Sequence, residues 1–147
     1  MTAPTIMLSR EDLDLLKRIH GHLCGMVLLG ARTARTARAA LASGLPFGFY
    51  RGFGCAVDGI QIFSGCTTGN GNLVLLRGRD HSFCLTTEGA GEGILVSPLP
   101  GTLERIRNPE SRDTEILMEW LGSVPDDEIL LSEPVSDIGV LTRFPGE

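Results

Sequence analysis

The chain has 147 residues, of which 42% are hydrophobic and 21% charged, and its formal net charge is −5 at pH 7. This length and composition predict a single globular domain with a hydrophobic core of its own. The negative charge argues against a nucleic-acid-binding protein, which needs a basic surface.

The longest apolar run, residues 23–31, is too short to span a bilayer, so no membrane partner is expected. The N-terminus shows no basic flank followed by an apolar core, which is the pattern of a secretory signal. We therefore expect a cytoplasmic protein. In that compartment the four cysteines should be free thiols or metal ligands rather than disulfides.

Two helices are predicted in the N-terminal third of the chain. A capping-box pattern begins at Ser9, and the apolar stripe of the first helix ends at His20. Gly21 is expected to end this helix, and a second helix should cover about residues 24–43. The second helix is rich in glycine and alanine, which predicts close backbone contact with a sheet or a partner subunit. Its arginines, which recur every three residues, are interpreted as a solvated edge rather than an anion-binding stripe.

The middle of the chain has the character of a sheet. Residues 49–56 are strand-like, and residues 58–63 favour a helical turn. Three further strand-like runs, at residues 73–76, 82–86 and 93–96, are joined by short connections. Connections of this length predict an antiparallel meander.

The C-terminal part is predicted to be largely helical. Ser111 and Asp113 should open a helix that Gly122 stops, and residues 125–131 resemble a second helical start. Residues 135–147 are expected to form an edge strand or an extended arm. The complete prediction is an α+β fold: N-terminal helices packed on a mostly antiparallel sheet, with a C-terminal helical extension.

The segment from His20 to Cys24 places two imidazoles and a thiol within five residues, and these groups suit zinc, iron or copper. His20 and His22 cannot share a helical face, so both reach one metal only if the segment is non-helical, which Gly21 permits. A core-packed His20 is an equal alternative. Cys24 should lie in the first turn of a helix, where the helix dipole lowers a thiol pKa; this suits a metal ligand or a redox nucleophile.

The other cysteines differ in their surroundings. Cys66 lies among small residues in a glycine-rich loop, so we expect it to be accessible, and it is the strongest single candidate. Burial and ligation are equally good interpretations of Cys55. Cys84 is interpreted as a packed strand residue, and His81, in the turn before it, as a solvated loop residue.

The glycine- and asparagine-rich loop at residues 65–72 should expose backbone N–H groups. A phosphate cradle is one interpretation, although the Gly-Lys-Ser/Thr ending of a standard phosphate loop is absent. Asp58 and Gln61 are interpreted first as capping residues. The alternative for Asp58 is an outer partner that orients a metal ligand.

Three segments in this order, residues 20–24, 55–61 and 64–73, resemble the FmdE family, which is named for the E component of formylmethanofuran dehydrogenase. The resemblance covers about residues 15–95, and residues 121–135 are similar to the family's C-terminal extension. The family usually has Cys-Pro-Gly where this chain has Cys24-Gly25-Met26.

The resemblance implies one α+β domain over residues 1–147, with a core at about 9–100 and a helical extension at about 101–147. It also implies dimerisation, a metal or active site, and a link to molybdenum or tungsten formylmethanofuran dehydrogenase chemistry. The residues and the resemblance together give a set of expected site residues. These are His20, His22, Cys24, Cys55 and Cys66 as metal ligands, Cys24 and Cys66 as catalytic groups, Gln61, Thr67, Gly69 and Asn72 as cofactor-binding residues, and Asp58 as the outer partner.

Three functional hypotheses stay open. The first is a protein with one transition-metal site, with zinc or iron favoured and an iron–sulfur cluster or haem as alternatives. The second is a non-catalytic accessory or carrier subunit for a metal, haem or anionic cofactor that docks on a larger redox enzyme. The third is a metal-free thiol redox protein. The small-residue helix adds the prediction of a homodimer.

Overall fold

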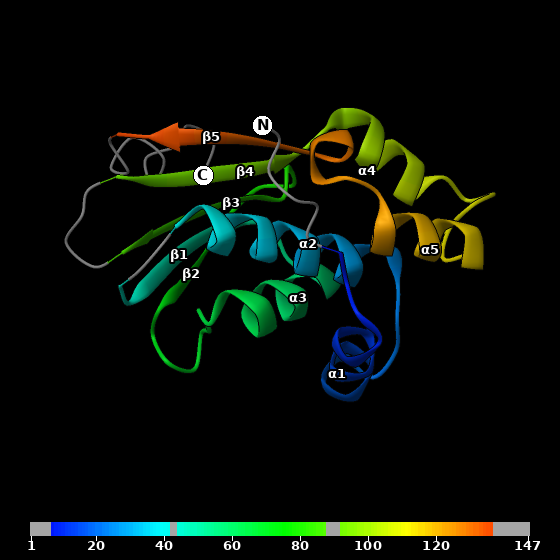
Figure 1. Cartoon of the computed structure of the whole chain (residues 1–147), viewed down its shortest axis with the longest axis horizontal. Helices are drawn as coiled ribbons and strands as arrows, with labels where there is room; N and C mark the ends of the chain where they lie inside the picture. Colours follow the sequence, from blue (N-terminus) through cyan, green and yellow to red (C-terminus); the bar gives the residue numbers. More distant parts are fainter. Residues whose placement is uncertain (1–6, 42–43, 88–91, 137–147) are drawn as a thin grey trace.

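The computed structural model describes residues 7–41, 44–87 and 92–136. Its elements in chain order are α1 (Arg10–His20), α2 (Gly25–Ala40), β1 (Pro46–Arg51), α3 (Cys55–Ser64), β2 (Leu73–Leu76), β3 (Ser82–Thr87), β4 (Gly93–Pro98), α4 (Pro100–Arg107), α5 (Glu115–Ser123), a short 3-10 helix η1 (Asp126–Glu128) and β5 (Leu130–Val135). Helices α2 and α3 lie along one face of the sheet, and α4 and α5 lie beyond one end of it (Figure 1). The predicted α+β class is confirmed.

The sheet has the strand order β2-β1-β3-β4-β5. Only the pair β1–β2 is parallel among the described strands; β1–β3, β3–β4 and β4–β5 are antiparallel. The predicted meander is therefore right for β3 and β4 and wrong for β2. The chain crosses from β1 to β2 through α3, and β1 lies between β2 and β3. A connection that contains a helix permits this parallel pairing.

The predicted strand at residues 49–56 is wrong at its C-terminal end. β1 stops at Arg51, and Cys55 is already the first residue of α3. Gly54, with φ +85°, separates the two elements in a conformation that side-chain-bearing residues rarely adopt. As a result Cys55 lies at the N-terminal end of a helix rather than on a strand.

Helices α2 and α3 touch backbone to backbone. A Cβ atom on Gly30 would collide with the carbonyl oxygen of Ala56, and one on Gly59 would lie 2.5 Å from Val27 O. Gly30 of α2 thus serves a close contact with α3, which the sequence did not indicate, and the helix also contacts the sheet at β3 and β4. The same helix also contributes Val27, Leu28 and Leu29 to the hydrophobic core.

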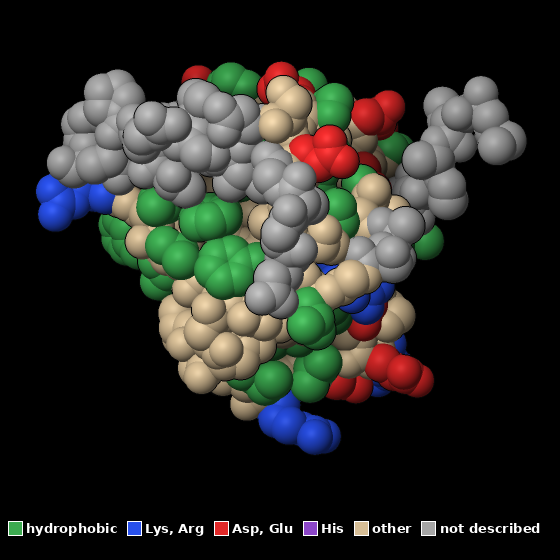
Figure 2. Space-filling model, turned by 90° about the vertical axis from the view of Figure 1, so that its left-hand side faces the viewer, with side chains coloured by type: hydrophobic (Ala, Val, Ile, Leu, Met, Phe, Trp, Pro, Cys, Tyr) green, Lys and Arg blue, Asp and Glu red, His purple; other side chains and the backbone are tan. Residues whose placement is uncertain are grey.

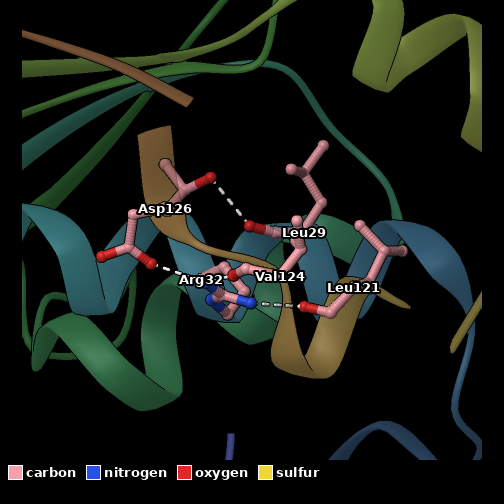
Figure 3. Close-up of polar contacts among 6 residues, drawn as sticks. Leu29, Arg32, Leu121, Val124 and Asp126 are labelled. Carbon is pink, nitrogen blue, oxygen red and sulfur yellow. Dashed lines mark hydrogen bonds and ion pairs between the residues drawn. The ribbon is translucent and has the colours of Figure 1, made fainter. Parts of the chain in front are cut away.

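Arg32 is fully buried, so the predicted solvated edge is wrong at this position. Its guanidinium donates to the carbonyl oxygens of Leu121 (2.7 Å) and Val124 (2.5 Å) and to Oδ1 of Asp126 (2.6 Å), as Figure 3 shows. The segment from α5 to η1 covers this face of α2. The sequence of the helix alone cannot reveal a cover that comes from so far along the chain. The contact ties α2 to the C-terminal part of the chain.

The C-terminal extension is not purely helical. After α4, α5 and η1, residues 130–135 form β5, which pairs antiparallel with β4 at the edge of the sheet. The edge strand therefore begins five residues before the predicted position, and residues 137–147 of that prediction lie outside the described part. No helix among the described residues is long and apolar enough to cross a membrane.

Figure 2 views the molecule from the left-hand side of Figure 1 and shows hydrophobic side chains gathered on the surface at that end. Several large hydrophobic residues near β1, β2 and β5 are exposed, namely Leu45, Val74, Leu75 and Leu131.

Candidate metal centre

His20 and His22 are brought together by the way α1 ends. The helix starts with a capping box between Ser9 and Asp12 and finishes at His20. Gly21 then adopts a left-handed conformation (φ 96°), so His22 lies in a bend rather than on the helix. The two imidazole ring centroids are 4.6 Å apart. The segment between the two histidines is therefore non-helical, as binding of one metal by both of them requires.

Cys24 and Cys55 come from the N-terminal ends of two neighbouring helices. Cys24 immediately precedes α2 and Cys55 opens α3. The two helices cross near these ends, where Gly30 of α2 meets Ala56 of α3, and the sulfur atoms of the two cysteines lie within 4.8 Å of each other. Cys24 is buried and Cys55 is partly buried.

Four potential ligand atoms, one each from His20, His22, Cys24 and Cys55, all lie within 4.8 Å of one another. The Sγ atom of Cys24 is 4.0 Å from Nε2 of His20. In a tetrahedral zinc site, with Zn–N near 2.0 Å and Zn–S near 2.3 Å, ligand atoms are about 3.3–3.8 Å apart. Small side-chain movements would therefore give a two-histidine, two-cysteine set of this geometry, so the residues present fit a zinc or iron ion.

Asp58 lies directly behind His20. Its Oδ2 atom is 2.7 Å from Nδ1 of His20, which leaves Nε2 facing Cys24. A carboxylate on the far nitrogen is the usual partner of a metal-binding histidine, because it fixes the tautomer and the ring orientation. Asp58 is in the first turn of α3 but does not cap that helix, whose N-cap is Gly54.

Burial is the main reason that the pKa of the Cys24 thiol is raised to about 11. A backbone hydrogen bond from Val27 lowers this pKa, and the neighbouring Cys55 raises it. The expected effect of the helix dipole, a lowered pKa, is therefore outweighed by burial. In the metal-free protein Cys24 is a protonated thiol at neutral pH, which is a poor nucleophile.

The cluster opens into a cleft of about 250 Å³. Its lining residues are His22, Cys24, Met26, Cys55, Ile106, Arg107, Arg112 and Asp113. Asp113 has a left-handed backbone conformation (φ 56°), and its Oδ1 accepts a hydrogen bond from the backbone N–H of Gly25 (2.9 Å). The C-terminal part therefore supplies one wall of the site. Only a helix-opening role was predictable for Asp113, because nothing local links it to a residue 88 positions away.

Cys66 does not join the four-residue cluster. It is fully buried, and its backbone N–H donates to Ser64 Oγ (3.0 Å). The expectation of an accessible thiol is wrong, because Cys66 packs beneath β1: its Cβ lies 3.5 Å from the position of a Cβ on Gly48. Burial raises the pKa of Cys66, and burial likewise raises the pKa of Cys84, on β3, to about 11.

The loop that includes Thr67, Gly69 and Asn72 satisfies many of its own polar groups. The N–H groups of Thr67 and Asn72 donate to Asn70 Oδ1, and that of Thr68 donates to Gln61 Oε1. A phosphate cradle needs such N–H groups to point freely at a ligand. Gln61 and its neighbours thus have a structural role in closing the loop, and their assignment to cofactor binding stays a prediction.

His81 is a residue that sequence reasoning missed. The prediction of a solvated residue is wrong: His81 is 6% exposed, and its Nδ1 lies 2.5 Å from the hydroxyl of Tyr50. Its backbone is left-handed (φ 57°), which is uncommon for residues other than glycine. Burial lowers its pKa, as does the charge of Arg107. The position of the histidine in a short turn offered no signal of this burial.

Comparison with solved structures identifies a similar fold. A crystal structure of a tungsten formylmethanofuran dehydrogenase FmdE-like protein from Syntrophus aciditrophicus matches with a TM-score of 0.72. The match covers 99% of this chain and 83% of the other, at 23% sequence identity. Comparison with curated proteins gives no match.

The sequence itself matches the family described as FmdE, molybdenum formylmethanofuran dehydrogenase operon, over residues 19–130. The matched segment contains all four residues of the cluster and also Asp58. This chain belongs to the FmdE family.

Proposed function

We propose that this protein binds one transition-metal ion, zinc or iron, through His20, His22, Cys24 and Cys55. The observation that carries the proposal is the convergence of four ligand atoms within 4.8 Å of one another, with Asp58 hydrogen-bonded to His20. Imidazole and thiolate ligands together favour zinc and iron over magnesium or calcium. Cys66 has no part in this site.

Three of the four ligands, His22, Cys24 and Cys55, line the adjacent cleft. His20 is turned toward Asp58 and does not line the cleft. Such a site is accessible from one side, and a small molecule in the cleft could reach it. A bound metal there would supply Lewis-acid or redox chemistry, in keeping with the link between the family and a molybdenum dehydrogenase operon.

The same arrangement of ligands is compatible with an alternative function, that of an accessory protein that holds a metal and docks on a larger redox enzyme. A metal-free thiol redox protein receives less support, because burial raises the pKa values of Cys24, Cys66 and Cys84. A homodimer stays part of the proposal. It is supported by the exposed hydrophobic residues near β1 and β2, and sedimentation of the purified protein at micromolar concentration measures it.

The test is metal analysis and a visible absorption spectrum of protein purified without added metal. We expect about one zinc or iron per chain. The changes Cys24→Ser and Cys55→Ser should abolish metal retention, whereas Cys66→Ser and Cys84→Ser, at buried thiols outside the cluster, should leave it intact. Equal metal loss in all four variants, or none in any, would contradict the proposed site.

A further inference from the structure

The cleft at the metal centre continues into a second, larger cleft of about 480 Å³. The two clefts share the side chains of Met26, Arg107 and Arg112 as a common wall. The second cleft adds Phe53, Arg79 and His81. We call the second cleft the arginine groove; its lining is Met26, Phe53, Arg79, His81, Arg107 and Arg112.

The arginine groove is positively charged in a protein whose net charge is −5. Within the described part of the chain, Arg79, Arg107 and Arg112 form no ion pair, whereas Arg32 and Arg35 are matched to aspartates. The charge of Arg107 also reaches the floor of the groove, where it lowers the pKa of His81 after the larger effect of burial. Unpaired guanidinium groups around a concave surface favour an anionic ligand.

The floor of the groove is fixed by the pair of Tyr50 and His81. Because Nδ1 of His81 is engaged by the Tyr50 hydroxyl, Nε2 is the ring nitrogen left to contact a ligand. Gly52 allows this placement, since a Cβ there would lie 2.7 Å from the His81 ring. A neutral imidazole in this position can donate to an acid group or accept from a hydroxyl.

An uncommon backbone conformation marks one wall of each cleft. His81 (φ 57°) and Asp113 (φ 56°) are the two residues other than glycine with positive φ in the described chain. His81 lines the arginine groove, and Asp113 lines the cleft at the metal centre. Residues with such a backbone conformation cluster at active sites and ligand-binding sites.

We propose that the arginine groove binds a small molecule with two or more phosphate or carboxylate groups and directs its other end to the metal centre. Planar guanidinium groups bind both kinds of acid group through paired hydrogen bonds. The shared wall of Arg107 and Arg112 lets one ligand span both clefts. Only the contact between the far end of the ligand and the metal rests on the proposed metal site. Binding of the acid groups depends on the arginines alone.

Isothermal titration calorimetry with inorganic pyrophosphate and with tricarballylate tests the proposal, using metal-free and zinc-reconstituted protein at low ionic strength. The test variant is Arg107→Gln/Arg112→Gln. Its matched control is Arg10→Gln/Arg18→Gln, which removes the same charge from exposed positions on α1. We expect saturable binding of at least one probe, about tenfold or more weaker in the test variant and within about twofold of wild type in the control. Circular dichroism of each variant reports whether it folds.

The two probes distinguish phosphate from carboxylate recognition. Binding of either probe supports the proposal that the arginine groove is an anion site. Failure of both probes to bind, or equal weakening in both variants, would overturn the inference even if zinc is retained. Conversely, the purified protein could retain no metal and still bind pyrophosphate in a way that depends on Arg107 and Arg112. That result would support the anion site and refute the proposed metal function. Tighter binding of tricarballylate to the zinc form than to the metal-free form would support a ligand that reaches both.

Discussion

Asp58 Oδ2 lies 2.7 Å from His20 Nδ1, although the two residues are 38 positions apart in the sequence. This contact joins the last residue of α1 to the first turn of α3. It holds the imidazole with Nε2 directed at Cys24. In the proposed metal site, the carboxylate would therefore act on a bound ion through the histidine rather than as a ligand.

The change Asp58→Asn tests this positioning role. The amide keeps the size of the side chain but removes the negative charge that favours the required tautomer. We expect metal affinity to fall by about 10- to 100-fold, measured by competition with a chromophoric chelator. The control Asp14→Asn, on the exposed face of α1, should leave the affinity unchanged. An Asp58→Asn protein with wild-type affinity would refute the role.

Gly59→Ala tests the contact between α2 and α3. The added Cβ would lie 2.5 Å from both Ala31 N and Val27 O, so the helices must separate. We expect the free energy of unfolding to fall by about 1–3 kcal/mol, together with weaker metal binding because Cys24 and Cys55 move apart. Chemical denaturation and the chelator competition measure the two effects.

The control for this change is Gly122→Ala on α5, where a Cβ would meet no atom within 4 Å. Alanine is the better helix former, so this variant should be unchanged or more stable by up to about 1 kcal/mol. Equal stability of the two variants would show that the helices are not in close contact.

Much of the candidate metal site was predictable because it is local in sequence. His20, His22 and Cys24 lie within five residues, and a single glycine gives the bend that unites them. The sequence favoured Cys66 over Cys55, but the four-residue cluster contains Cys55 and not Cys66. A loop with small residues suggests an accessible thiol, but packing under β1 buries Cys66 completely.

Features that depend on distant parts of the chain were not predictable. The acid that neutralises Arg32 is 94 positions away, and the strand that pairs with β2 precedes it by a whole helix. Strand-like runs with short connections are typical of an antiparallel meander. Nothing in their local sequence indicates that β1 lies between β2 and β3. The same reason explains why the burial of His81 against Tyr50 was missed.

Arg32→Met should destabilise the protein strongly. The change leaves the carbonyl oxygens of Leu121 and Val124 without their donor and Asp126 without its partner. We expect a loss of about 3 kcal/mol in the free energy of unfolding, because breaking a buried ion pair leaves unsatisfied groups behind. Urea denaturation measures it. The exposed Arg38→Met should change the value by less than about 0.5 kcal/mol, and a similar small effect at Arg32 would contradict the structural role.

Stability should fall as the pH drops through the titration of His81. Burial and the charge of Arg107 lower its pKa in the folded protein below the ordinary value of 6.5, while Asp80 opposes this shift. The unfolded chain therefore binds the proton more readily, so the stabilisation is present above pH 6.5 and is lost as the pH falls below it.

Comparison of wild type with His81→Asn measures this contribution, because asparagine tolerates the left-handed backbone. Urea denaturation at pH 7.5 and 5.5 should show a larger loss of stability in the wild type than in the variant. Identical losses would show that His81 has no part in the pH dependence.

The backbone contact between α2 and α3 has a consequence for ion selection. The two thiols of the proposed site are carried at the starts of these helices, so their separation is set by the helix–helix contact around Gly30 and Gly59 rather than by flexible loops. A fixed spacing of two thiols favours ions whose bond lengths to sulfur match it. Substitutions in this interface, which change no ligand residue, would then alter which metal the protein prefers.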